Sequence, residues 1–224
     1  MTTTQHALRS LAMAHDASAS VPFELAAFWQ KLRSGAWLFS DTFSTSERFY
    51  ALLCQPARPE PLDRRKLELL EAMLLGGRPK VVAMERDRAL STISMAVQDC
   101  LRSMGLSARP SQASVLLSMA AIALHRPGFA PARGRLSEVA FKERSYLVVS
   151  ALRPDLQFPV RLSDAEAAVL RSLVAGNSYA QISGERATSP RTVANQLTTA
   201  SRKLGVSGRR AIIERLIQHS AQFG

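Results

Sequence analysis

An internal repeat constrains this chain more than any other feature of its sequence. When the 224 residues are shifted by one hundred positions, 62–117 align with 162–217 without a gap. Glycines and apolar positions match together, so the repeat predicts two copies of one structural unit. The identical pairs are Leu62/Leu162, Leu70/Leu170, Gly76/Gly176, Glu85/Glu185, Arg86/Arg186, Thr92/Thr192, Arg102/Arg202, Gly105/Gly205, Ser107/Ser207, Arg109/Arg209 and Leu116/Leu216.

A β-hairpin is expected ahead of each copy. Two aromatic-rich runs flank a Ser/Thr-rich turn, which predicts strands near 36–42 and 48–54. A second pair of apolar runs follows residue 135, with a turn near Lys142 and Glu143. The expected fold is mostly α with short β-hairpins. It has two tandem hairpin-plus-four-helix units, which pack through their fourth helices as a pseudo-dimer.

The chain divides into four segments by composition. Residues 1–20 are small and polar, which predicts a flexible tail, with an amphipathic helix around Leu8 to Met13 as the alternative. Residues 21–124 form the first unit, whose leading helix is expected to open at Pro22 and to end at Gly35. The proline- and glycine-rich residues 125–135 are typical of a linker, and residues 136–224 form the second unit.

The second unit carries clear helix start and stop signals. Ser163 followed by Glu166 fits a capping box, Ser189 followed by Pro190 fits a helix start, and Gly205 fits a helix end. The expected helices are about 163–175, about 178–185, Pro190 to Gly205, and about 209–221. Short second and third helices joined by a tight turn are typical of a helix-turn-helix.

The outer face of the third helix predicts contact with DNA. Asparagine can pair with adenine through two hydrogen bonds, threonine can meet a base edge or a thymine methyl, and arginine can anchor phosphates. The candidate DNA-binding residues of the second copy are Ser189, Arg191, Thr192, Ala194, Asn195, Thr198, Arg202, Lys203 and Arg209. Those of the first copy are Lys80, Thr92, Ser94, Met95, Gln98 and Arg102.

The positive net charge of the chain favours a polyanionic partner such as DNA. The distribution of this charge favours the second copy as the unit that binds it. The formal net charge is +11. Residues 1–125 hold 14 basic and 11 acidic side chains, whereas residues 126–224 hold 15 and 7. Asp99 also lies on the outer face of the first copy, where it would repel phosphate. The first copy therefore either binds DNA weakly or serves mainly as a partner for the second.

Residues 162–217 resemble the LuxR/GerE-type helix-turn-helix of bacterial transcription regulators. The resemblance rests on Leu162, Glu166, Leu170, Gly176, Ile182, Ser189, Arg191, Thr192, Val193, Leu197, Lys203, Leu204, Gly205, Val206, Ser207 and Arg209. It implies that the third helix enters the major groove and that the fourth is a dimerisation surface. The first copy resembles the family more weakly. Where the family has leucine in the second helix, both copies have arginine, Arg86 and Arg186, which must extend outward or pair, for instance with Glu85 or Glu185.

Several function classes find no support in the sequence. There is no glycine-rich phosphate loop, paired-carboxylate site or Ser/His/Asp set, so we expect no enzyme and no cofactor. The four histidines are scattered, so no metal site is expected, and Cys54 and Cys100 are expected to be free thiols. No apolar run is long enough to span a membrane, and no secretory signal is evident.

The predicted function is a cytoplasmic, sequence-specific transcriptional regulator that binds double-stranded DNA. It would act as a monomeric pseudo-dimer or as a homodimer, with another regulator or RNA polymerase as further candidate partners. The alternative is a protein-interaction module, a decoy that binds another LuxR-type regulator through its fourth helix and does not itself read DNA.

Overall fold

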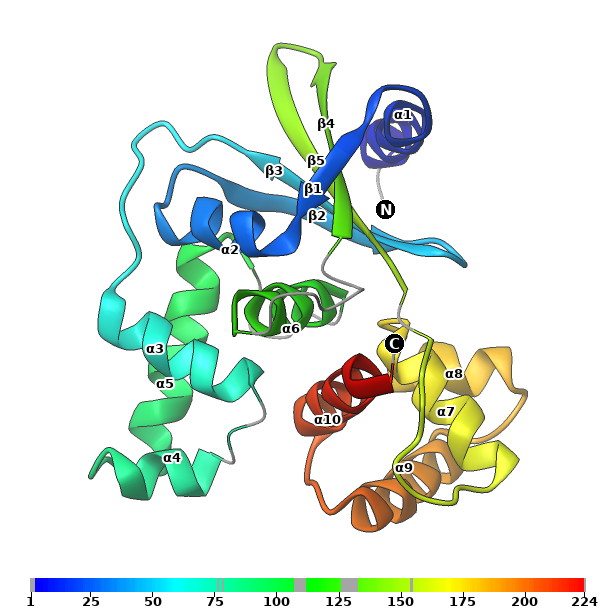
Figure 1. Cartoon of the computed structure of the whole chain (residues 1–224). Coiled ribbons are helices and arrows are strands. Elements are labelled where there is room, and N and C mark those ends of the chain that lie inside the picture. Colours follow the sequence, from blue (N-terminus) through cyan, green and yellow to red (C-terminus); the bar gives the residue numbers. More distant parts are fainter. Residues whose placement is uncertain are drawn as a thin grey trace.

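The two predicted hairpins join into one sheet. The computed structural model describes residues 3–75, 77, 79–106, 112–125, 133–153 and 155–223. Its antiparallel sheet has the strand order β1-β4-β5-β3-β2 (Figure 1). The strands are β1 (Val21–Glu24), β2 (Leu38–Ser44), β3 (Arg48–Cys54), β4 (Arg133–Phe141) and β5 (Arg144–Leu152). The hairpins and the Lys142–Glu143 turn lie where the sequence predicts them, but the fold is mixed α/β rather than mostly α.

Strand β3 shows why the sheet is covered on both faces. Phe49, Ala51 and Leu53 belong to the main hydrophobic core, whereas Tyr50 and Leu52 belong to a second, smaller core. Successive side chains of a strand point to opposite faces, so a continuous apolar run requires cover on both sides. Helix α1 (Thr3–Ala19) contacts β4 and β5 on the side of the smaller core, and the remaining helices enclose the main one.

The N-terminal segment departs from the prediction. Residues predicted as a flexible tail form α1, which is the amphipathic alternative in a longer form. Its buried residues, Leu8, Ala12 and Asp16, are spaced by four and so lie on one helix face. The predicted start of the following helix at Pro22 is also wrong. Val21–Glu24 pair with β4 as an edge strand, and helix α2 (Leu25–Arg33) begins only after them. Proline is tolerated on an edge strand, since its missing N–H breaks no central ladder.

Two sets of four helices follow the hairpins at matching positions. The first set is α3 (Arg64–Leu74), α4 (Pro79–Glu85), α5 (Leu90–Ser103) and α6 (Gln112–His125). The second set is α7 (Asp164–Val174), α8 (Tyr179–Glu185), α9 (Pro190–Leu204) and α10 (Arg209–Phe223). Helices α7 to α10 agree with the predicted ones to within about two residues. Most of the predicted linker, residues 126–132, lies outside the described residues.

Helix α6 is the central helix of the fold. Every residue from Val115 to Ala123 is buried, and the helix contacts α2, α3, strands β2 and β3, and α10 (Figure 1). A helix that is apolar all round requires cover on every side, which explains this position. The contact between α6 and α10 lies within a single core that also contains Leu116 and Leu216, both fully buried.

Candidate nucleic-acid interface

Local capping interactions position helix α9. Ser189 Oγ accepts the backbone N–H of Thr192 at 3.0 Å, and Pro190 occupies the first helical turn. At the other end Gly205 adopts a left-handed φ of 67°, and its N–H donates to the carbonyl of Arg202 at 3.2 Å. The turn before α9 contains Ala187 at φ 48°. Both ends of α9 are therefore determined by residues that the sequence predicts as helix start and stop signals.

Helix α9 has one buried face and one exposed face. Val193, Leu197, Ala200 and Leu204 are buried. The exposed residues of the opposite face include Arg191, Asn195, Thr198 and Arg202. Thr198 Oγ1 donates to the carbonyl of Ala194 at 2.9 Å, which fixes the rotamer of the threonine and leaves its oxygen able to accept. The two arginines thus flank a short polar stretch along the helix.

Three other candidates on or near α9 are engaged within the protein. Ser189 and Thr192 take part in capping the N-terminus of α9, with 2.9 Å between their hydroxyl oxygens. Lys203 Nζ lies 2.7 Å from Glu166 Oε2, and this pairing, with the capping contacts to Ser163, lowers the pKa of Glu166. Ala194 is half-buried. The side chain of Arg209 lies outside the described part of the structure.

The candidate residues predicted in the first half of the chain lie on α4 and α5 and differ in chemistry from those of α9. Lys80, Thr92, Ser94, Met95, Gln98 and Arg102 are all exposed. However, Arg102 Nη2 lies 3.0 Å from Asp99 Oδ1, and Lys66 Nζ lies 3.3 Å from Asp99 Oδ2. Asp99 therefore offsets the positive charge of two neighbours on this face. Met95 is 62% exposed, which is unusual for an apolar side chain.

The two arginines that depart from the family pattern have different surroundings. Arg86 extends outward, with Nη1 3.8 Å from Glu68 Oε2 and not paired with Glu85. Arg186 is half-buried, and its Nε has no hydrogen-bond partner among the described residues. Glu185, the other expected partner, accepts two hydrogen bonds from Asn177 Nδ2, at 2.8 and 3.0 Å. Arg86 therefore follows the outward alternative of the prediction, and its acidic neighbour is Glu68 rather than Glu85.

A buried polar network beneath α1 has no counterpart in the sequence prediction. Asp16 accepts hydrogen bonds from Ser150 Oγ at 2.6 Å and from the Tyr50 hydroxyl at 3.3 Å. Arg48 Nε donates to Ser150 Oγ at 3.0 Å and lies 3.4 Å from Asp16 Oδ2. Burial, reinforced by Asp16, raises the pKa of Tyr50 to about 12, and burial lowers the pKa of Arg48. Such a network depends on strand pairing that a linear pattern does not reveal.

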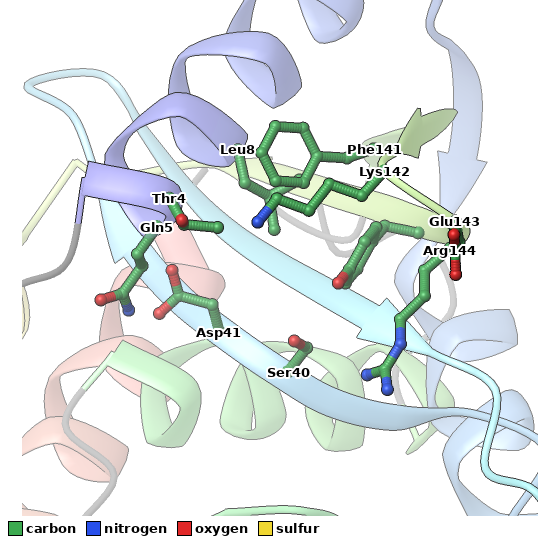
Figure 2. A pocket seen from close by; sticks show the side chains of 10 residues that line it. Thr4, Gln5, Leu8, Ser40, Asp41, Phe141, Lys142, Glu143 and Arg144 are labelled. Atoms are coloured by element: carbon green, nitrogen blue, oxygen red, sulfur yellow. The ribbon is translucent and has the colours of Figure 1, made fainter.

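A hollow of about 570 Å³ lies beside the N-terminal end of α1 (Figure 2). Thr4, Gln5 and Asp41 line one end, and Glu143 and Arg144 line the other. Both acidic and basic side chains line it, and Arg9 Nε lies 2.6 Å from Asp41 Oδ2. Within the described ranges, no group of three or more His, Cys, Asp or Glu side chains could hold a metal ion. No helix in these ranges is long and apolar enough to cross a bilayer.

Comparison with known proteins agrees with the geometry of α7 to α10. Residues 160–216 match the model of bacterial regulatory proteins of the luxR family (GerE), whose members are regulators and generally not enzymes. The match does not include residues 62–117, so the predicted first copy finds no support in this comparison. No curated protein and no solved structure is detectably similar to the chain. Residues 160–216 are therefore a LuxR/GerE-type helix-turn-helix domain, and this domain implies that the protein is a DNA-binding transcriptional regulator.

Proposed function

We propose that the protein reads specific DNA sequences by placing α9 in the major groove. The exposed face of α9 carries this proposal, because it presents Asn195 and Thr198 between Arg191 and Arg202. Asparagine and threonine can read base edges, and the flanking guanidinium groups can bind phosphates on either side. The protein would act on chromosomal DNA in the cytoplasm, without a cofactor.

We further propose that residues 62–117, the first copy, form the same helical unit as residues 162–217, the second copy. Helices α3 to α5 begin and end within one residue of the positions given by a shift of one hundred. Asp87 and Ala187 both have φ of 48°, at the same point in the turn before α5 and α9. The N–H of Arg88 donates to the carbonyl of Ala83 at 2.9 Å, as that of Thr188 does to Ser183 at 3.1 Å. Shared backbone detail of this kind supports a common unit.

A pseudo-two-fold arrangement of the two copies is supported by the elements that pair. Strands β3 and β5 end their respective hairpins and pair with each other in antiparallel register, with Tyr50 opposite Ser150. Helices α6 and α10 end their respective helical sets and contact each other. Equivalent elements that pair with one another are the mark of a two-fold interface. One chain would thus supply the two DNA-facing units that a dimer supplies from two chains.

Selection of bound fragments from a random duplex pool, with the full chain, tests this function. We expect one well-defined half-site, read by α9, and a second half-site with weaker preferences about one helical turn away. Binding to the selected site should also weaken steeply as salt rises, because arginine contacts release counterions from phosphate. A pool that shows no preferred bases after repeated rounds would contradict sequence-specific reading.

A further inference from the structure

A cleft of about 1020 Å³ lies between the two sets of helices. Val81 and Leu90, from α4 and α5, line one wall, and Leu204 and Val206, from the end of α9 and the residues after it, line the other. Three cationic side chains, Lys80, Arg202 and Arg215, also line it, and the lining residues include no Asp or Glu. The cleft therefore has an apolar lining, and all of its charged side chains are positive.

Its size and chemistry favour a peptide helix as the occupant. Small-molecule sites have volumes of roughly 300–1,000 Å³, so this cleft is at or above the upper end of that range. A helix lying in a groove buries apolar side chains at positions i, i+3, i+4 and i+7, and can carry acidic side chains along its edges. A DNA backbone would match the three cations, but it offers little apolar surface for Val81, Leu90, Leu204 and Val206.

The outer surface beside the cleft supports the same conclusion. Of the seven large apolar side chains that are exposed among the described residues, four lie on α4 and α5. They are Val81, Met84, Leu90 and Met95, with exposed fractions of 43%, 81%, 42% and 62%. One hundred residues further on, α8 and α9 carry Gln181, Gly184, Pro190 and Asn195 at these positions. An exposed apolar group of this size, which α8 and α9 lack, is typical of a protein-binding surface.

We infer that this cleft binds an acidic amphipathic helix from another protein. The apolar face of such a helix would contact Val81 and Leu90 on one wall and Leu204 and Val206 on the other. Its acidic edges would reach Lys80, Arg202 and Arg215. This function goes beyond DNA reading by α9. Of the candidate DNA-binding residues, Lys80 and Arg202 also line the cleft, so a bound helix would compete locally with phosphate for these two cations.

The test uses the full chain and a labelled synthetic helix of 14 residues with leucine on one face and glutamate on the other. Fluorescence anisotropy should show binding in the micromolar range. A matched peptide with lysine at every glutamate position should not bind, and one with serine at every leucine should bind at least about tenfold more weakly. Equal binding of the serine peptide would overturn the inference, because the basic protein would then be attracting negative charge alone.

Variants locate the binding on the molecule. The double substitution Val81→Glu/Leu90→Glu should weaken peptide binding at least about tenfold. The control Val21→Glu/Leu152→Glu makes the same charge change at two exposed apolar residues that do not line the cleft, and it should bind within twofold of the unaltered chain. Equal loss in both double variants would overturn the assignment of the helix to this cleft.

Two further measurements distinguish an acidic helix from the other possible occupants of the cleft, which are DNA and a second copy of the chain. A third keeps this test independent of the proposed function. If Val81→Glu/Leu90→Glu weakens DNA binding more than tenfold beyond the control, the cleft is part of the DNA path and the inference fails. If sedimentation shows that the unaltered chain dimerises and the cleft variant does not, the occupant is a second copy and the inference also fails. Failure of DNA reading itself is diagnosed independently, by substitution of Asn195, which does not line the cleft.

Discussion

Asp16 in α1 and Ser150 in β5 are joined by a hydrogen bond of 2.6 Å, although 134 residues separate them. Both residues are buried, and Arg48 of the other hairpin donates to the same serine hydroxyl. One carboxylate therefore connects the N-terminal helix to both hairpins.

Replacement of Asp16 by alanine should destabilise the protein strongly. The change leaves the largely buried guanidinium of Arg48 without its counter-charge, which typically costs about 3–5 kcal/mol. Chemical denaturation monitored by circular dichroism measures the free energy of unfolding. The exposed Asp155 provides a control, since Asp155→Ala should change that free energy by less than about 0.5 kcal/mol. Similar values for the two variants would mean that the network does not hold α1.

The same network should make stability depend on pH in the alkaline range. The pKa of Tyr50 is about 12 in the folded protein and 10 as an ordinary phenol. Because the folded value is the higher, the stabilisation is complete below pH 10 and is lost as pH rises toward 12. The difference in unfolding free energy between the unaltered chain and Tyr50→Phe should shrink by about 2 kcal/mol between pH 9 and pH 11.5. A difference that stays constant over this range would argue against the buried phenol.

Arg191→Ala and Arg202→Ala should each weaken DNA binding. If each guanidinium neutralises one phosphate, the slope of log K against log salt should fall by about one unit per substitution. Arg64, which is highly exposed on α3 and pairs with Glu68, provides a control of the same charge. Unchanged affinity in both α9 variants would show that this helix does not contact DNA.

Asn195 should determine which base is preferred at one position of the site. A bidentate contact with adenine is worth roughly 1–3 kcal/mol of discrimination, and Asn195→Ala should abolish that preference while leaving the others. Competition binding with single-base variants of the selected site measures the effect. Gln98→Ala, at an exposed position of α5, should change the preferences less. Identical preferences before and after Asn195→Ala would show that this side chain does not read a base.

The contact between α6 and α10 should make the chain unfold as one unit. Leu116 is fully buried in the shared core, so Leu116→Ala should cost about 2–5 kcal/mol. Because β3 pairs with β5 and α6 contacts α10, spectroscopic probes placed before and after residue 125 should report the same loss of stability. Two separate unfolding transitions, with only the first shifted, would contradict the pseudo-dimer.

Much of the helical architecture follows from short stretches of sequence. Ser163 with Glu166 forms a capping box, Ser189 with Pro190 begins α9, and the left-handed Gly205 ends it, as predicted. These signals are local, because a cap is satisfied by backbone groups three or four residues away. The exposed and buried faces of α9 likewise follow from helical spacing alone.

The way the parts come together was decided by tertiary structure. Pro22 begins a helix in the linear pattern, but it lies in an edge strand because β4 offers a partner more than one hundred residues away. Thr3–Ala19 form a helix whose buried face packs against the sheet, because that face of the sheet requires cover. Hydrogen bonds between distant strands and the burial of a shared core depend on which segments meet in space. A one-dimensional pattern of caps, glycines and apolar positions does not record that information.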